Sequence, residues 1–162
     1  MILPPDMTAA WTLWGEARGE PVHGIVAVAC VIYNRAYRDA FVSHDEHLNM
    51  EERIPKICLA HKQFSFWVDG EFTQQQPDPN SFKWHVCQEI GRELLHGFVP
   101  MFNATHYYAR AMPVKPYWAD DLEFVDCIHG HVFMYDKALS IGGERFATIS
   151  HHSLASPLPV VV

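Results

Sequence analysis

The hydrophobic positions at the start of the chain recur every three or four residues, which is typical of one face of an α-helix. This pattern predicts a helix from Asp6, its expected N-cap, to about Arg18. A second helix is predicted over about residues 21–38, after Gly19. Its middle, residues 25–32, is apolar nearly all round, so we expect this helix to be buried at the centre of the fold. The apolar face of the first helix comprises Ala9, Ala10, Leu13, Trp14 and Ala17.

The middle of the chain has a weaker pattern. Residues 39–52 are polar and acidic and are expected to form a loop, followed by a short helix over about residues 53–60. Residues 63–67, with the sequence QFSFW, lack helical spacing and are expected to be extended. Residues 69–80 are rich in turn formers. The inward side chains expected on the short helix are Ile54, Ile57 and Cys58.

Late in the chain the spacing of hydrophobic residues changes from one typical of helices to one typical of strands. A helix capped by Asn80 is predicted to end at His96, and two short strands are predicted over residues 105–109 and 131–135. The expected class is therefore helix-rich α+β. Residues 1–138 are expected to form one domain and residues 139–162 a tail. The inward residues expected on the third long helix are Phe82, Cys87, Ile90, Leu94 and Leu95.

Composition narrows the class of protein. A chain of 162 residues with 49% hydrophobic and 19% charged residues can bury one core, which excludes general disorder. The net charge of −7 argues against a nucleic-acid binder that works through its net charge and against a basic membrane lysin. No run reaches the ~18 apolar residues of a membrane span, so no membrane insertion is expected. We expect a monomer.

The cysteines and the N-terminus bear on the cellular compartment. The four cysteines form no CxxC pair, which excludes zinc-ribbon and thioredoxin sites, and Cys30 lies in an apolar run where a buried thiol is expected. A single disulfide stays open as an alternative. The first residues have neither a basic nor an apolar region, so we expect synthesis in the cytoplasm without a signal peptide.

Two carboxylates lie close together at the junction of the first two helices, in the segment GEARGEP. Glu16 falls at the edge of the apolar face, where loss of hydration favours the protonated form of a carboxyl group and would suit a general acid. The alternative is that Glu16 and Arg18 are solvated charges at a helix end. Glu20 is placed to complement the N-terminal dipole of the second helix.

The same segment begins a series of motifs that resembles the cell wall hydrolase family, which includes SleB-type spore cortex-lytic enzymes and many phage and prophage endolysins. The resemblance covers about residues 8–136, in the order found in the family. The motifs are WGEARGEP at 14–21, VIYNR at 31–35, QFSFW at 63–67, ATHYY at 104–108, PYWA at 116–119 and IHGHVF at 128–133.

This resemblance implies a lysozyme-like fold that acts on peptidoglycan glycan strands, with Glu16 as the catalytic acid. In the spore enzymes one Glu protonates the MurNAc-β-1,4-GlcNAc oxygen, and the 6-hydroxyl then closes a 1,6-anhydro ring. This lytic transglycosylase reaction requires neither a second carboxylate nor a metal or other cofactor. The alternative is a muramidase that needs a second carboxylate. The candidates for that carboxylate are Glu20, Asp69, Asp120, Asp121, Glu123 and Asp126.

Sugar rings present apolar faces rimmed by polar groups, so a glycan-binding groove needs aromatic side chains beside polar ones. In an extended segment Gln63, Ser65 and Trp67 share one face and are expected to line the groove, with Phe64 packed inward. On the later strand, Tyr107 and Tyr108 point to opposite faces, and we favour Tyr108 for the groove. The other expected substrate-binding residues are Glu20, His106 and Trp118.

Two readings of a different class remain open. His129 and His131 share a face if extended and could serve a metal-dependent amidase or endopeptidase, although structural roles are favoured for both. The chain could also be a non-catalytic glycan-binding protein. Within the favoured reading, the expected role is that of an endolysin that reaches the cell wall after release through a holin.

Overall fold

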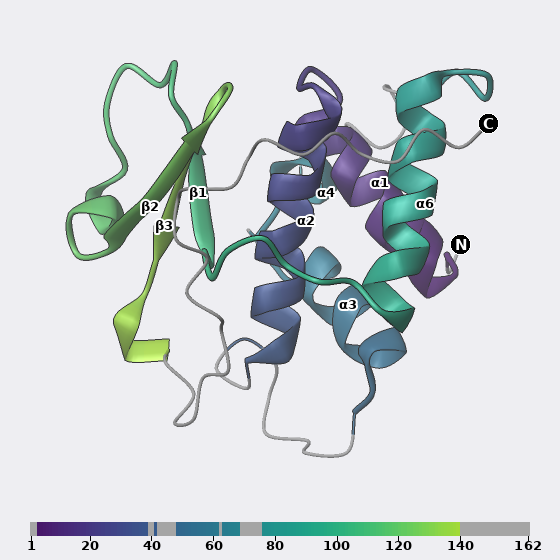
Figure 1. The fold of residues 1–162 in the computed structure, drawn as a ribbon, viewed down its shortest axis with the longest axis horizontal. Coiled ribbons are helices and arrows are strands. Elements are labelled where there is room, and N and C mark those ends of the chain that lie inside the picture. Colours follow the sequence, from purple (N-terminus) through teal and green to yellow (C-terminus); the bar gives the residue numbers. More distant parts are fainter. Residues whose placement is uncertain (1–2, 39–40, 42–47, 62, 69–75, 140–162) are drawn as a thin grey trace, which may run out of the picture.

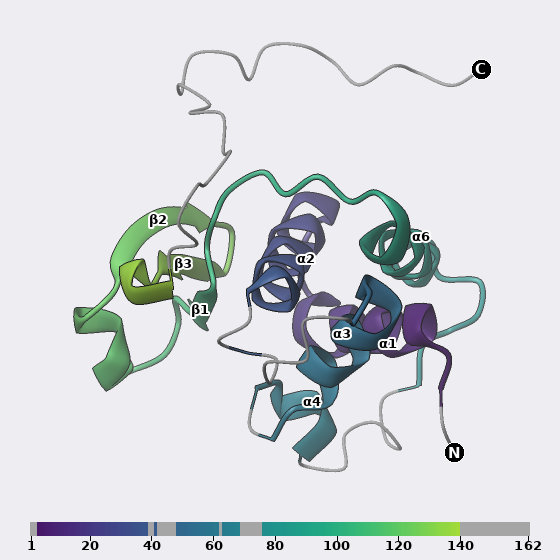
Figure 2. The same cartoon turned by 90° about the horizontal axis from the view of Figure 1, so that it is seen from below.

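The computed structural model describes residues 3–38, 41, 48–61, 63–68 and 76–139. The helices of this part of the chain pack together beside a small sheet, with α2 between the sheet and the pair formed by α1 and α6 (Figures 1 and 2). The helices are α1 Pro5–Ala17, α2 Val22–Tyr37, α3 Met50–Leu59, α4 Ser65–Val68 and α6 Phe82–His96. The strands and short 3-10 helices are β1 His106–Ala109, η1 Tyr117–Asp120, β2 Glu123–Ile128, β3 His131–Tyr135 and η2 Lys137–Leu139.

Helix α1 lies tightly against α6. Its N-cap is Pro4 rather than Asp6, because Pro5 fits the first helical position and places Asp6 within the first turn. The two helices lie close together at Gly91, where an added Cβ would lie 2.5 Å from the Asp6 carbonyl oxygen. Trp11 and Trp84 fill the same interface, with ring centroids 5.1 Å apart.

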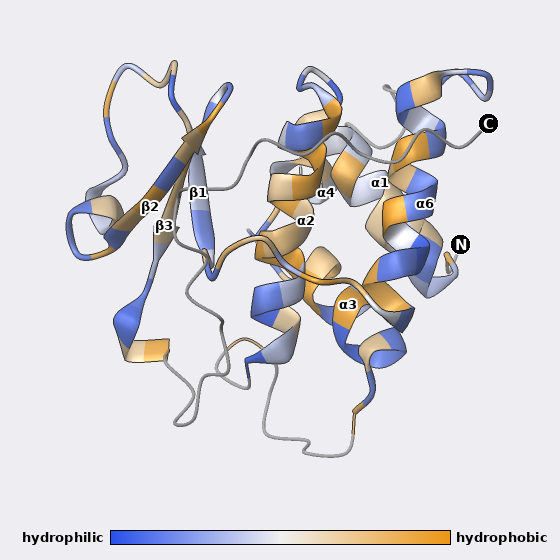
Figure 3. Cartoon of the chain, in the orientation of Figure 1, coloured by the Kyte–Doolittle hydropathy of each residue, from blue (hydrophilic) through white to orange (hydrophobic). Residues whose placement is uncertain are grey.

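Helix α2 is the buried central helix that the sequence predicts. Residues 24–32 are buried except Val26, which is half-buried. Figure 3 shows the middle of this helix as hydrophobic and its C-terminal part as more hydrophilic. These side chains form part of the hydrophobic core together with residues of the other helices and the sheet, and their burial stabilises the fold.

Helix α3 begins earlier than its apolar spacing predicts. Asn49 and Glu52 form a capping box, in which each side chain accepts a hydrogen bond of 3.1 Å from the backbone N–H of the other. The predicted loop 39–52 therefore ends at residue 49, and its residues 39–40 and 42–47 lie outside the described part. The three predicted inward side chains of this helix are buried: Ile54, Ile57 and Cys58.

Three further local predictions are wrong, one on residues 63–67 and two on the start of α6. Residues 65–68 form a one-turn helix, α4, rather than an extended segment. Helix α6 begins after Ser81, not Asn80, and Phe82 is 71% exposed. Phe82 lies outside the apolar face of this helix because that face follows the spacing of its buried residues, Trp84, Cys87, Gly91 and Leu94.

The sheet has the strand order β1-β3-β2, and all its pairs are antiparallel. Both predicted strands are present, but β2 was not predicted. A register shift between Phe124 and Asp126 interrupts its alternation, which explains the weak signal. His129 and Gly130 form the turn between β2 and β3, with His129 at a φ of 50°, as the tight turns of hairpins require.

All four cysteines are free thiols, so the alternative of a disulfide is excluded. Burial raises the pKa of Cys30 to about 11 and the pKa values of Cys58 and Cys87 to about 12. Cys127, on β2, is exposed.

No helix among the described residues is long and apolar enough to cross a membrane. The predicted tail, residues 139–162, lies outside the described part except for Leu139.

Candidate active site

Glu16 lies in the last turn of α1, where the chain leaves the helix toward α2. Its half-buried carboxyl group is surrounded by three donors from two other elements. The Tyr107 hydroxyl on β1 donates to Oε2 at 2.7 Å. The Ser65 hydroxyl and the Phe66 backbone N–H on α4 both donate to Oε1 at 3.3 Å. The carboxyl group is thus held between a helix end and the sheet.

Gly15 allows α4 to come this close. A Cβ on Gly15 would lie 2.1 Å from the Phe66 ring, so only glycine leaves room for that ring against α1. Phe66 also stacks on Trp11, with centroids 6.2 Å apart. Trp67 then donates its indole N–H to the Thr12 hydroxyl at 2.9 Å. These contacts fix α4 on α1 and place its N-terminal groups at Glu16.

Tyr107 reaches Glu16 because α2 fixes the start of β1. Asn34 donates to the carbonyl oxygens of Phe102 and Ala104 at 2.9 and 2.8 Å, and Arg35 donates to that of Thr105 at 2.6 Å. Both side chains are buried. Both side chains therefore join the C-terminal half of α2 to the residues that lead into β1.

The Tyr107 phenol stays protonated over a wide pH range. Burial is the main cause that raises its pKa well above 10, and the neighbouring Glu16 charge acts in the same direction. Tyr107 is therefore a constant hydrogen-bond partner for Glu16. Tyr107, rather than Tyr108, contacts Glu16, and the predicted place of Tyr108 in the groove stays a prediction.

Arg35 places a buried positive charge behind the site. Its guanidinium lies 5.5 Å from the ring centroids of Phe41 and Phe64 and donates to Gln63 Oε1 at 2.8 Å. Burial lowers its pKa, while the charges of Tyr107 and Glu16 act in the opposite direction. The guanidinium therefore interacts electrostatically with Glu16 and Tyr107.

The segment expected to line the groove does not present a single face. Because residues 65–68 are helical, Gln63, Ser65 and Trp67 diverge: toward Arg35, Glu16 and Thr12, respectively. Only Ser65 contacts the candidate acid. Phe64 is buried, as predicted.

Glu20 lies at the α1–α2 junction and holds the hairpin turn. Its Oε2 accepts a hydrogen bond of 3.1 Å from the Gly130 backbone N–H, and its Oε1 lies 3.8 Å from His131 Nδ1. Its carboxylate therefore has protein partners, in addition to a position just before the N-terminus of α2. Its predicted contact with substrate remains a prediction.

The other predicted substrate-binding residues form a cluster on the opposite side of β1. Trp118 from η1 packs against His106 and Tyr108, with ring centroids 5.4 and 6.0 Å apart. Since side chains alternate along a strand, this cluster faces away from the side on which Tyr107 meets Glu16. The structure brings the three residues together but not to Glu16.

The histidine pair does not form a metal site in the described residues. His129 lies in the hairpin turn and His131 on β3, so they do not share a strand face as expected. His129 instead lies near His23, with ring centroids 6.3 Å apart. Within the described part of the chain, no group of three or more His, Cys, Asp or Glu side chains is placed to hold a metal ion.

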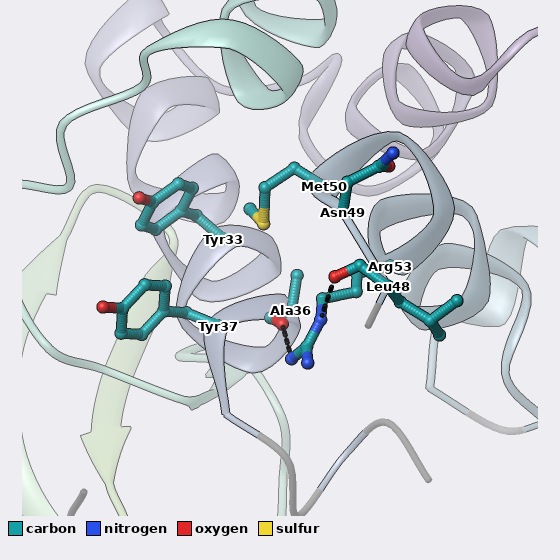
Figure 4. A pocket seen from close by; sticks show the side chains of 7 residues that line it. All are labelled: Tyr33, Ala36, Tyr37, Leu48, Asn49, Met50 and Arg53. Atoms are coloured by element: carbon teal, nitrogen blue, oxygen red, sulfur yellow. Dashed lines mark hydrogen bonds between the residues drawn. The ribbon is translucent and has the colours of Figure 1, made fainter. Parts of the chain in front are cut away.

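A separate pocket of about 320 Å³ lies between the C-terminal half of α2 and the start of α3 (Figure 4). The stacked rings of Tyr33 and Tyr37, 6.1 Å apart, form one wall, and Arg53 forms another. None of the residues around Glu16 lines this pocket. It is therefore distinct from the candidate active site.

The sequence indicated Glu16 as the acid and Ser65 as a residue of the site. It did not indicate the other groups around the Glu16 carboxyl group, which are Tyr107, Arg35 and the backbone N–H of Phe66. One signal was available for Tyr107. It pairs with Phe133, which is fully buried, so the apolar face of β3 indicates which face of β1 points inward.

Comparisons with known proteins agree with this architecture. A family model described as Cell Wall Hydrolase matches residues 19–134, beginning three residues after Glu16. The catalytic domain of the germination-specific lytic transglycosylase SleB from Bacillus anthracis has a similar structure, with a TM-score of 0.60 and 22% identity over 83% of this chain and 96% of that one.

A second similar structure is the catalytic domain of the Bacillus cereus SleB protein, with a TM-score of 0.59 and 24% identity over 80% of this chain and 89% of that one. A comparison with curated protein sequences found no match. The predicted fold class, a lysozyme-like α+β fold with a small late sheet, is confirmed.

Proposed function

Because the chain belongs to the cell wall hydrolase family, we propose that this enzyme is a lytic transglycosylase that cleaves the MurNAc-β-1,4-GlcNAc bond of peptidoglycan, with Glu16 as its catalytic residue. The observation that carries the proposal is the set of partners of the Glu16 carboxyl group. One is a backbone N–H, which can only donate, and two are hydroxyls, which can donate or accept. Such a set suits a carboxyl group that must work in both protonation states.

In the first step Glu16 acts as a general acid. Its proton passes to the glycosidic oxygen as the bond to C1 of the muramoyl residue breaks, and GlcNAc leaves with a free hydroxyl. Positive charge develops at C1, and the new carboxylate lies beside it. Tyr107 and Ser65 then donate to the carboxylate, while the buried charge of Arg35 stabilises it.

In the second step Glu16 acts as a general base. The muramoyl 6-hydroxyl attacks C1, and its proton returns to the Glu16 carboxylate as the 1,6-anhydro ring closes. The enzyme is regenerated, and no water is consumed. Each product end is accounted for: one chain ends in anhydro-MurNAc and the other begins with GlcNAc.

The contacts of Glu20 with other protein groups support a mechanism with one catalytic carboxylate. A hydrolase would need a second carboxylate that is free to act as a nucleophile or to activate water. Glu20, four residues after Glu16, is instead bound to the Gly130 N–H and lies beside His131. The similarity of the fold to a structure described as a lytic transglycosylase points in the same direction.

The substrate is expected to approach Glu16 along exposed groups near α4. Ser65 is exposed and already contacts the Glu16 carboxyl group, so it is the predicted substrate-binding residue with the best support. The roles proposed for Gln63, Trp67 and the Trp118 cluster place them at sugars farther from the cleaved bond. No cofactor takes part in this scheme.

Mass spectrometry of the soluble products tests the proposal. Purified peptidoglycan is digested with the parent protein, with Glu16→Gln and, as a matched control, with Glu93→Gln, which changes an exposed carboxylate on α6. We expect anhydro-muropeptides, one water lighter than hydrolysis products and not reducible by borohydride. Glu16→Gln should lower their rate of formation about 10³-fold, while the control is unchanged.

Two results would contradict the proposal. Reducible muramic acid ends would assign hydrolysis and require a second carboxylate. Activity in Glu16→Gln equal to that of the parent would remove Glu16 from the chemistry altogether.

The endolysin role stays a prediction with its own test. Expression in the bacterial cytoplasm with a co-expressed holin should cause a rapid fall in culture turbidity. Expression without a holin, or of Glu16→Gln with a holin, should not.

A further inference from the structure

The Glu20 side chain fills a space that exists because two neighbouring residues are glycines. A Cβ on Gly24 would lie 2.7 Å from the Glu20 Cβ, and a Cβ on Gly130 would lie 2.5 Å from its Oε1. The Glu20 side chain is only 17% exposed. A carboxylate fitted into such a narrow space, with its Oε2 on the Gly130 N–H, fixes the turn of the β2–β3 hairpin against the α1–α2 junction.

His131 continues this connection toward the candidate active site. Its ring lies on the same face of the sheet as Tyr107 and Phe133, and it meets the Tyr107 ring edge to face at 5.1 Å. Its Nδ1 is buried and has no hydrogen-bond partner among the described residues. At 3.8 Å, Glu20 Oε1 is too far for a hydrogen bond but close enough for an electrostatic interaction.

These contacts form one path between the two carboxylates of the GEARGEP segment. It runs from Glu20 to His131, from the His131 ring to the Tyr107 ring, and from the Tyr107 hydroxyl to Glu16 at 2.7 Å. The path crosses from the helices to the sheet and back. A shift of the hairpin would move His131 and Tyr107 together, and a shift of about 1 Å at a catalytic group can cost 10²-fold in rate.

We propose that Glu20 and His131 are positioning residues that hold the Tyr107 hydroxyl against the Glu16 carboxyl group. The inference rests on the proposed function and assigns Glu20 a role in the alignment of the acid rather than in contact with the sugar. It also explains why the hairpin turn has glycine at position 130 and why glycine stands at position 24, in the first turn of α2.

The charges around His131 agree with this arrangement. Burial is the largest effect and lowers the His131 pKa below 6.5, while the charges of Glu20 and then Glu16 oppose it. The imidazole is therefore neutral at neutral pH. Loss of the Glu20 charge should lower the His131 pKa further, which gives a signal independent of catalysis.

The first test compares turnover on soluble glycan strands. Glu20→Ala and His131→Ala should each lower kcat about tenfold and leave KM within about twofold, because they misplace the acid without removing a substrate contact. Glu20→Gln should restore kcat to within about threefold of the parent, since its amide oxygen can still accept from the Gly130 N–H. Glu93→Gln is the matched control.

Double variants separate positioning from a general loss of stability. In a Tyr107→Phe background, Glu20→Ala and His131→Ala should have little further effect on kcat, because their action passes through the Tyr107 hydroxyl. If each double variant instead showed a fall in kcat equal to the product of the two single falls, the proposal would be overturned. Values of kcat within twofold of the parent for both alanine variants would also overturn it.

An NMR titration of the His131 imidazole completes the test and does not depend on activity. Glu20→Gln should lower its pKa relative to the parent, and an unchanged value would overturn the link between the two side chains. Failure of the proposed function has a different signature, namely an inactive parent or an active Glu16→Gln, and it leaves the NMR result to decide whether the link exists.

Discussion

On the face of β1 that is turned toward the helices, Tyr107 donates its hydroxyl hydrogen to Glu16, whereas on the opposite face His106 and Tyr108 pack against Trp118. Both faces are rich in aromatic rings, and both belong to the same tetrapeptide. The difference lies in the partners. The inner face meets a carboxyl group and a buried arginine, whereas the outer face meets the 3-10 helix η1 and, through His106, the Phe41 ring, with ring centroids 6.0 Å apart.

This comparison shows how one short strand can separate two tasks. Groups that align the acid are on the inner face, and groups proposed to bind distant sugars are on the outer face. If the separation holds, substitutions on the inner face should lower kcat, and substitutions on the outer face should raise KM.

The largest effect is expected from a substitution that separates α4 from α1 and so removes two hydrogen-bond donors from Glu16. Gly15→Ala should lower the free energy of unfolding by about 2–3 kcal/mol, because its Cβ would lie 2.1 Å from the Phe66 ring and force α4 away from α1. Activity should fall with it, since Ser65 and the Phe66 N–H would leave Glu16. Urea denaturation measures the change in the free energy of unfolding, and the rate at which soluble muropeptides form measures the change in activity.

The matched control for this change is Gly19→Ala. Nothing lies within 4 Å of a Cβ at Gly19, so this variant should be about as stable as the parent. Equal stability of the two alanine variants would show that the contact between Gly15 and Phe66 does not limit the position of α4.

The next largest effect should distinguish the faces directly. Tyr107→Phe removes the hydroxyl that donates to Glu16 and should lower kcat about 10–100-fold, the range for a hydrogen bond to a charged group. Tyr108→Phe should leave kcat within about twofold of the parent. Steady-state kinetics on soluble glycan strands provides the measurement, and a reversed order of the two variants would contradict the separation of faces.

A smaller effect is expected on the outer face. Trp118→Ala should raise KM about threefold to tenfold, the equivalent of one lost aromatic stacking contact, and leave kcat unchanged. An unchanged KM would remove Trp118 from the substrate-binding residues. A fall in kcat would show that the outer face also supports the chemistry.

The smallest effect concerns stability at low pH. Burial, aided by the Arg35 charge, lowers the pKa of His106 from 6.5 to about 4. The unfolded chain therefore binds a proton at His106 near pH 6.5, and the folded chain does so only near pH 4. The contribution of neutral His106 to stability is present above pH 6.5 and is lost as the pH falls toward 4.

His106→Gln isolates this contribution from the titration of other groups. The melting temperature of the parent should fall more between pH 7 and pH 4.5 than that of the variant. Parallel curves for the two proteins would contradict the assigned cause.

Periodicity alone predicted the helices that bury a continuous apolar face. The limits of α2 and α6 differ from the predicted ones by at most one residue, because Pro21 precedes the first residue of α2 and Gly97 follows the last residue of α6. Helix α3 was predicted too short, since the Asn49–Glu52 capping box extends it beyond its apolar spacing. Local rules thus account for most of the helical part.

The site required information that local rules do not contain. Alternation places Tyr107 and Tyr108 on opposite faces of β1 but does not say which face meets α1. That choice depends on long-range pairing with β3 and on the bonds from Asn34 and Arg35 to the residues before β1. Likewise, α4 is helical because Phe66 packs onto Gly15, a contact between segments about fifty residues apart.

The distribution of the thiols makes the protein convenient for chemical labelling. Only a thiolate reacts readily with maleimides, and burial holds the pKa values of Cys30, Cys58 and Cys87 at about 11 to 12, far above neutral pH. Cys127 is the exposed thiol, on the strand next to the β2–β3 turn. A fluorophore can therefore be attached to the hairpin of the native protein, without prior removal of the buried cysteines, to follow its distance from a second label on the helices during glycan binding.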